Sequence, residues 1–214
     1  MANDAADYPL VALLRHRMGV DGAGVTTLAA SFGCPLRCRM CLNPQCWREG
    51  TRYTRVTARQ LYDMARVDDL YFQATGGGVT FGGGESLLHA DFIRRFRALC
   101  GGAWRLTAET SLNVPPERVR TALECVDEFI VDIKDTDPDI YRRYTGADNA
   151  RALDNLAAVL AAAGPERVLV RVPLIPGYNT EADAERSAGR LRAMGATRLD
   201  RFTYRVMPEW PARE

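Results

Sequence analysis

The sequence predicts an α/β protein in which six parallel strands curl into an incomplete barrel, (β/α)6. Short apolar runs rich in β-branched residues alternate with segments whose apolar residues recur at helical spacing, which is typical of βαβ units. The 214 residues suffice for a single domain, 1–214, with a sizeable core. Each cluster of unusual residues also follows a predicted strand directly. Because barrel active sites lie at the carboxyl ends of the strands, this favours a barrel over a doubly wound open sheet.

The strands are expected where glycine or turn residues bound a short apolar run. They are predicted at residues 25–31, 76–81, 104–108, 129–131, 168–172 and 199–206. The stretch 10–18, which precedes them, is predicted to form a short helix or a cover.

Helix starts are marked by local capping patterns. Thr57 is followed by Gln60 and Thr180 by Asp183, which are both capping-box patterns. Two prolines at 115 and 116 suit the first turn of another helix. Helices are therefore predicted at 57–66, from 115 onward and at 180–194, and apolar spacing adds helices at 91–99 and 153–160.

Composition excludes several classes of protein. The chain has 28 basic and 27 acidic residues and a formal charge of +1, so no broad basic field points to nucleic acid or a membrane surface. No apolar stretch is long enough to span a bilayer. Six cysteines, half of them clustered, do not resemble a disulfide framework. We therefore expect a soluble, cytoplasmic protein of a reducing compartment.

Three cysteines, Cys34, Cys38 and Cys41, form a CxxxCxxC motif after the first predicted strand. Four cysteine thiolates normally hold a four-iron cluster, so three leave one iron without a protein ligand. An unfilled coordination position is typical of reactive metal centres. The CxxC part alone would also suit half a zinc site or a redox pair. However, no second ligand pair for zinc is apparent, and a redox pair needs no third thiol.

Two further groups follow predicted strands. Gly83, Gly84 and Glu85 end the second strand, where glycine lets the backbone approach a ligand closely, although a plain glycine turn has the same pattern. Asp132 and Lys134 alternate at the end of the fourth strand, so both side chains lie on one side. Lys134 is the only lysine among the 28 basic residues. An ammonium and a guanidinium are not interchangeable where geometry matters, which favours a specific role over a simple salt bridge.

Three single residues complete the candidate site. Glu109 follows the third strand and suits a hydroxyl group, a monovalent cation or a backbone amide. Ile175, in a proline-bounded turn after the fifth strand, offers an apolar edge for a flat ring, or only a rigid turn. Met40, inside the cysteine motif, is a second apolar contact for the same ring, although methionines often only fill space.

These motifs resemble those of the radical S-adenosylmethionine (SAM) enzymes. The chain from Val20 to about Val206 is similar to the glycyl-radical-enzyme activating enzymes of that superfamily, the pyruvate formate-lyase activating enzyme type. The matching segments are 20–24, 34–43, 76–80, 83–85, 109–111, 132–134 and 172–177.

The resemblance implies the radical SAM fold and a [4Fe-4S] cluster on Cys34, Cys38 and Cys41. In that family SAM chelates the open iron, and an electron from the cluster splits the sulfonium to give a 5′-deoxyadenosyl radical. The residues expected to bind SAM are Met40, Gly83, Gly84, Glu85, Glu109, Asp132, Lys134, Ile175 and Arg205. The last stands near the position where the type member contacts SAM with a histidine.

The resemblance also implies the reaction and the partners. The radical would abstract a hydrogen atom from a glycine of a partner glycyl radical enzyme, and flavodoxin or ferredoxin would supply the electron. Relatives carry a further helix after the sixth strand, for which the last eight residues are too few. This keeps open a hydrogen abstraction from a small molecule or peptide in biosynthesis. An alternative of another class is a non-catalytic metal-binding module.

Overall fold

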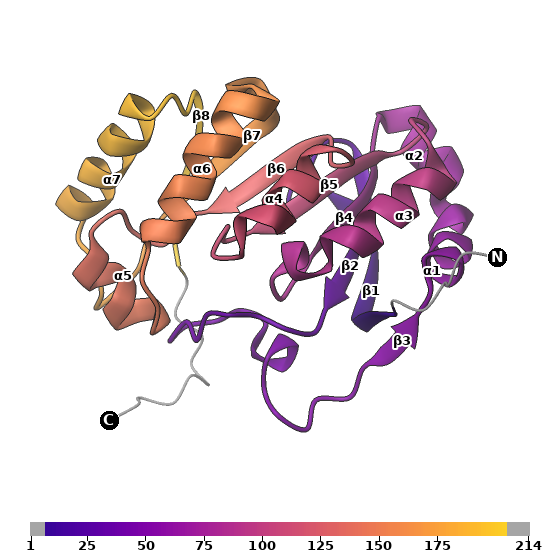
Figure 1. Ribbon diagram of the computed structural model, residues 1–214, viewed down its shortest axis with the longest axis horizontal. Helices are drawn as coiled ribbons and strands as arrows, with labels where there is room; N and C mark the ends of the chain where they lie inside the picture. Colours follow the sequence, from indigo (N-terminus) through magenta and orange to yellow (C-terminus); the bar gives the residue numbers. More distant parts are fainter. Residues whose placement is uncertain (1–6, 205–214) are drawn as a thin grey trace.

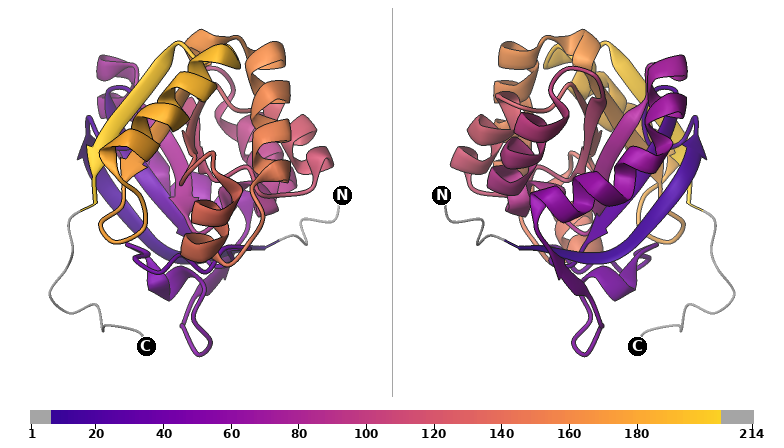
Figure 2. Two further views of the ribbon diagram at one scale, coloured as in Figure 1. Left: turned by 90° about the vertical axis from the view of Figure 1, so that its left-hand side faces the viewer. Right: turned by 90° about the vertical axis from the view of Figure 1, so that its right-hand side faces the viewer.

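The computed structural model describes residues 7–204, which form one eight-stranded sheet in the order β3-β1-β2-β4-β5-β6-β7-β8. Six of the strands are parallel, as predicted. They are β2 (Val25–Ser31), β4 (Gly78–Gly83), β5 (Arg105–Thr110), β6 (Glu128–Asp132), β7 (Val168–Leu174) and β8 (Arg198–Thr203). Figure 2 shows the sheet curled, with helices on its outer side. Within residues 7–204 no pairing joins β8 to β1 or β3, so the barrel is partial.

The helices that cover the sheet begin largely where the capping patterns predict (Figure 1). The Thr57 and Thr180 capping boxes both form, and each side chain accepts from the backbone three residues on. The helices are α1 (Ala58–Ala65), α2 (Asp69–Thr75), α3 (Ala90–Cys100), α4 (Pro116–Leu123), α5 (Pro138–Thr145), α6 (Ala150–Ala163) and α7 (Glu181–Ala193).

The prediction of a short helix or cover at residues 10–18 is wrong. This stretch belongs to strand β1 (Tyr8–Met18), which pairs antiparallel with β2 and, at its first residues, with β3 (Thr54–Val56). Leucine is a good helix former, but intrinsic propensity is outweighed by tertiary context, and here pairing gives the segment a ladder of backbone hydrogen bonds with β2. The sheet therefore has two antiparallel strands beyond the predicted six.

Helices α2 and α5 were not predicted, although α5 carries recognisable signals. The Asp137 side chain accepts from the backbone of Asp139 and Ile140, Pro138 stands in the first turn, and Gly146 ends the helix at φ +75°. The expected lack of a helix after the sixth parallel strand concerns residues 205–214, which lie outside the described part of the chain.

The core fills the space between the sheet and its helices. Phe81 of β4, Phe96 of α3 and Phe129 of β6 are fully buried there. None of the helices within residues 7–204 combines the length and the apolar character that crossing a membrane requires. Because the six parallel strands share one direction, their carboxyl ends meet at one edge of the sheet. The loops that leave this edge carry most of the residues predicted to form the functional site.

Candidate functional site

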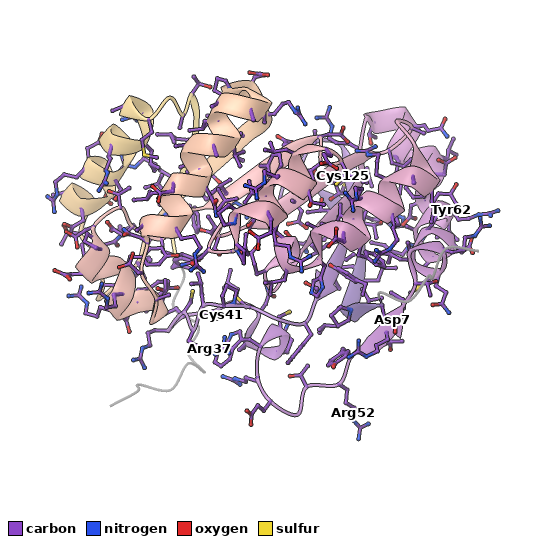
Figure 3. All side chains as sticks on the ribbon, in the orientation of Figure 1. Asp7, Arg37, Cys41, Arg52, Tyr62 and Cys125 are labelled. Carbon is purple, nitrogen blue, oxygen red and sulfur yellow. The ribbon has the colours of Figure 1, made fainter. Side chains whose placement is uncertain are left out.

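The cysteine motif lies on a long connection between β2 and β3, residues 32–53, which we call the cysteine loop. It contains one short 3-10 helix, η1 (Pro44–Cys46). Its first half is tied to α5, since the amide of Arg37 donates to the carbonyl of Thr145 (2.8 Å) and that of Arg39 to Tyr144 (3.0 Å). Figure 3 shows Cys41 and Arg37 on this stretch, at the edge of the molecule where the parallel strands end. The cysteine loop thus covers the predicted site edge.

Cys34, Cys38 and Cys41 are free thiols and half-buried. Burial raises the pKa of Cys34 to about 12, and the Glu85 carboxylate adds to this rise. Burial also raises the pKa of Cys38 to about 11, with Lys134 opposing it. Within residues 7–204, no three His, Cys, Asp or Glu side chains are already arranged to hold a metal ion. The loop gathers the thiols in one place without converging them on a coordination point.

The end of β4 lies directly under this loop. Gly83 has φ +82°, and a Cβ there would lie 2.7 Å from the Ala30 Cβ and 3.1 Å from the Cys46 Sγ. The amide of Gly84 donates to Ser31 (3.1 Å), and that of Glu85 donates to Gly33 (2.7 Å). Because glycine has no side chain, residues 83 and 84 let the end of β4 approach the start of the cysteine loop. This close approach explains why glycine stands at both positions.

The Glu85 carboxylate is fully buried and engaged by the protein. Its oxygens accept from the Thr110 hydroxyl (2.6 Å), from the Ser111 amide and hydroxyl (2.9 and 2.6 Å) and from the Leu87 amide (3.1 Å). Burial raises the pKa of Glu85, and the Ser111 and Thr110 donors oppose that rise. The carboxylate thus joins the end of β4 to the end of β5. A contact of residue 85 with SAM remains a prediction for its backbone.

Asp132 and Lys134 lie on one side of the chain, as predicted, and form an ion pair. The Lys134 Nζ donates to Asp132 Oδ2 (2.6 Å) and to the Tyr204 hydroxyl (2.8 Å). Burial acts most strongly and would lower the pKa of Lys134, but Asp132, together with the smaller contributions of Tyr204, Cys38 and Tyr144, raises this pKa well above its ordinary value. An ammonium has three N–H donors, so one remains. In the described residues Asp132 Oδ1 is buried without a hydrogen-bond partner.

An apolar wall stands beside this ion pair. Ile175, Tyr144 and Tyr204 form a buried cluster, and both Cys38 and Met40 pack against it. The structure therefore brings Met40 and Ile175 together, although 135 residues of sequence separate them. A flat apolar group would find contacts here, next to the cysteine motif and to Lys134.

Glu109 lies near the end of β5 and has a charged partner. Its Oε1 accepts from Arg171 Nη1 (2.9 Å), and the same guanidinium donates to the Val20 carbonyl (2.7 Å). Burial raises the pKa of Glu109, with Arg171 opposing. Asp132 is the register partner of Arg171 on the neighbouring strand. A role of Glu109 towards a ribose or a cation remains a prediction.

The sequence reasoning missed Arg171, Tyr144 and Tyr204. A signal existed for Arg171, which is the one charged residue in the β-branched run 168–172. Tyr204 alternates with Phe202 on the predicted last strand and so shares a face with it. Arg205, predicted to contact SAM, lies outside the described residues.

Three observations test whether these residues fit a cluster and SAM. The three free thiols are the donors that iron–sulfur clusters use. The remaining N–H of Lys134 suits a carboxylate, and the unpartnered Asp132 Oδ1 suits a hydroxyl or ammonium donor. The Met40 and Ile175 wall suits an aromatic base. The residues present fit both groups.

Comparison with known proteins adds a family. A model described as the radical SAM superfamily matches residues 29–187. The pyruvate formate-lyase-activating enzyme of Listeria monocytogenes is 35% identical over 142 residues, covering 63% of this chain and 57% of that protein. The (2S)-3-sulfopropanediol dehydratase activating enzyme of Klebsiella oxytoca is 34% identical over 127 residues, covering 59% of this chain and 39% of that protein. The chain thus spans about half the length of such relatives.

Among solved structures, SuiB of Streptococcus suis bound to S-adenosylmethionine is similar in fold. The TM-score is 0.65 at 13% identity, over 86% of this chain and 41% of that chain. The SAM-bound anSMEcpe structure has a TM-score of 0.60 at 15% identity, over 81% of this chain and 50% of that chain. At these identities the likeness concerns the fold alone.

Proposed function

The chain belongs to the radical SAM superfamily, and we propose that it holds a [4Fe-4S] cluster and SAM to abstract a hydrogen atom from a glycine of a partner glycyl radical enzyme. Two relatives at 34% and 35% identity are named as activating enzymes, which supports this substrate class. The observation that carries the proposal is the meeting of three free thiols with the Asp132–Lys134 pair at one edge of the sheet.

Each part of the site has a task in this proposal. Cys34, Cys38 and Cys41 would hold the cluster and leave one iron for the amine and carboxylate of SAM. When bound, the cluster and SAM would supply one-electron cleavage of the sulfonium, with the 5′-deoxyadenosyl radical as the hydrogen acceptor. Cysteine thiols must lose their protons to ligate metal. Because the pKa values of Cys34 and Cys38 are raised, cluster assembly would release protons.

The other residues bind and orient. Lys134 keeps its proton because of Asp132, so its remaining N–H can neutralise the SAM carboxylate. Asp132 Oδ1 can accept from a ribose hydroxyl. The backbone of Gly83, Gly84 and Glu85 would receive the amino group, and Met40 with Ile175 would cover the adenine and exclude water. Burial of the reactive group is the protein's contribution to radical chemistry that the cofactor performs.

The test begins with anaerobic reconstitution using iron and sulfide. We expect an iron–sulfur visible band and the formation of 5′-deoxyadenosine from SAM and dithionite. A protein that binds zinc instead, or that forms no 5′-deoxyadenosine, is a metal-binding module and contradicts the proposal.

The substrate is tested separately by electron paramagnetic resonance. An activating enzyme must leave a glycyl radical doublet on a glycyl radical enzyme from the same genome. Deoxyadenosine formation without any such doublet, but stimulated by a small molecule or peptide, would favour the biosynthetic alternative. The electron donor, a flavodoxin or ferredoxin, and a cytoplasmic location belong to the same proposal.

A further inference from the structure

The cysteine loop and the strand that follows it carry an unusual charge. Residues 34–56 contain five arginines, Arg37, Arg39, Arg48, Arg52 and Arg55, and a single carboxylate, Glu49. The whole chain has 28 basic against 27 acidic residues, so positive charge is concentrated here. All five side chains belong to exposed residues. We call them the loop arginines.

The loop arginines also differ from most other arginines in their partners. Among the described residues outside this segment, the majority of guanidinium groups pair with carboxylates, as Arg15 does with Asp68, Arg171 with Glu109 and Arg201 with Glu185. Within residues 7–204, no ion pair joins Arg39, Arg48, Arg52 or Arg55 to a carboxylate. Arg37 donates to the carbonyls of Cys34 and Leu36 (2.6 and 2.9 Å). Unneutralised like charges repel one another, so this segment is poised for an anionic partner.

Aromatic rings orient several of these guanidinium groups. Arg37 and Arg48 lie 5.0 and 5.9 Å from the centroid of Trp47, and Arg55 lies 5.7 Å from that of Tyr53. A ring holds a guanidinium in place without neutralising its charge. Tryptophan, tyrosine and arginine are also the residue types enriched at the centres of protein interfaces. The segment thus has the composition of a docking surface.

The position of the loop arginines, next to the cysteine motif, indicates which kind of partner they would bind. Figure 3 shows Arg37 beside Cys41 and Arg52 at the outer bend of the loop, pointing away from the sheet. The opposite side of the cysteines is closed by the sheet and by α5. An electron that reaches the cysteine site from another protein therefore has its shortest way through this loop.

We propose that the loop arginines dock an electron-donor protein whose exposed redox group is surrounded by acidic side chains. This inference rests on the proposed function, because it assumes that the cysteines hold a redox centre. In the docked pair the reduced donor gives up one electron and the centre held by the cysteines gains it. No bond forms or breaks in the transfer. Transient electron-transfer complexes typically bury less than about 1,200 Å² of surface. A single loop can supply an area of this size.

A nucleic acid is the less suitable occupant. Its binding depends on many phosphate contacts along an extended basic track, whereas the positive charge here is confined to one loop of a chain with net charge +1. A donor protein instead gains from complementary charge chiefly in the rate and orientation of encounter.

The experiment compares two reductants on the reconstituted protein. In the variant Arg48→Glu/Arg52→Glu, we expect deoxyadenosine formation with flavodoxin hydroquinone to fall by at least about 10-fold at low salt. The rate with dithionite should stay unchanged, and the flavodoxin rate of the unaltered protein should fall as salt is raised. The matched control is Arg120→Glu/Arg151→Glu, which reverses two exposed arginines on α4 and α6 and should leave both rates unchanged.

Other results either overturn the proposal or require a second variant or measurement. Equal flavodoxin rates in both double variants would overturn the proposal. If the Glu variant also loses the dithionite rate, Arg48→Gln/Arg52→Gln removes the charge without reversing it and must still lower the flavodoxin rate alone. If no protein cleaves SAM, the proposed function fails, and calorimetric binding of oxidised flavodoxin then tests the surface by itself. Loss of single-stranded DNA binding in the Glu variant, with flavodoxin binding intact, would assign the loop to nucleic acid.

Discussion

The ends of the parallel strands and the cysteine loop form the two halves of one site, but they are held differently. Asp132, Lys134, Glu109 and Arg171 each have a charged partner, and the backbone that carries Asp132 and Arg171 is fixed by sheet register. The cysteine loop has a single 3-10 helix and only a few backbone bonds to its surroundings. A sheet orders charged groups before any ligand arrives, whereas thiols on a loop need a metal to converge them. Four substitutions test this difference between the strand ends and the cysteine loop.

The largest effect is expected from Cys38→Ala. Three thiols are the minimum donor set here, so bound iron after reconstitution and deoxyadenosine formation should fall to background. The melting temperature of the metal-free protein should change little, because Cys38 lies outside the main core and packs only against the small cluster of Ile175, Tyr144 and Tyr204. Iron content measures the effect on the cysteine loop, and thermal unfolding measures the effect on the stability of the folded sheet.

Cys125→Ala is the control for this change. Cys125 is buried on the far side of the molecule (Figure 3), so the variant should keep its iron. It should lose stability of about 1 kcal/mol, which corresponds to roughly 2–4 °C in Tm. Full iron occupancy in Cys38→Ala would contradict the assignment of the cluster ligands.

The next largest effect is expected from Lys134→Met, which leaves Asp132 unpaired. A hydrogen bond to a charged group contributes about 1.5–3 kcal/mol, so SAM affinity should weaken by about 10–100-fold while iron content is retained. Lys134→Arg keeps the charge but brings a planar fork into a site shaped for an ammonium, and we expect a comparable loss. Equilibrium binding of SAM to the reconstituted variants measures both. Unchanged SAM affinity in Lys134→Arg would show that the site does not require an ammonium group, and would contradict the specific role inferred for the only lysine.

A smaller effect, on stability alone, is expected from Ser111→Ala. The change removes the hydroxyl donor to the buried Glu85 Oε2 and leaves the Ser111 amide in place, so the cost is that of one hydrogen bond, about 0.5–1.5 kcal/mol. Urea unfolding should show this loss. In Thr121→Ala the hydroxyl removed is exposed and donates to a carbonyl of its own helix, so the change should stay within about 0.5 kcal/mol. Equal stabilities of the two variants would show that Glu85 does not tie β4 to β5.

The smallest expected effect is a pH dependence of stability through His89. Its side chain contacts the start of the cysteine loop. Its Nε2 lies 3.2 Å from the carbonyl of Phe32, just before the cysteine motif. Burial lowers the pKa of His89 below its ordinary value of 6.5, so the unfolded chain takes up a proton first as pH falls. The stability that His89 contributes is therefore present above about pH 6.5 and is lost below it.

Urea unfolding at pH 7.5 and 5.5 measures this effect. The unaltered protein should lose more stability over that interval than His89→Gln, which cannot be protonated there. A steeper loss in the variant would mean that His89 is charged in the folded protein.

Much of the fold could be predicted because its signals are local. The strands β2 and β4–β8 follow from β-branched runs between turn residues, and α1 and α7 follow from capping boxes that form as written. The stretch 10–18 was mistaken because its leucines carry no local mark of the partner strand. Helix α5 was missed although Asp137, Pro138 and Gly146 supply both of its ends.

The sequence by itself determined which chemical groups stand at the strand ends: three thiols at fixed spacing, a glycine-rich turn, and a lone lysine two residues from an aspartate. These follow from spacing along a few residues, which backbone geometry converts directly into a shared side or loop. Only the tertiary structure decided that Tyr204 reaches Lys134 and that Arg171 reaches Glu109, across 70 and 62 residues of sequence. Such contacts depend on how far the sheet curls, and curvature is set by the packing of the whole core.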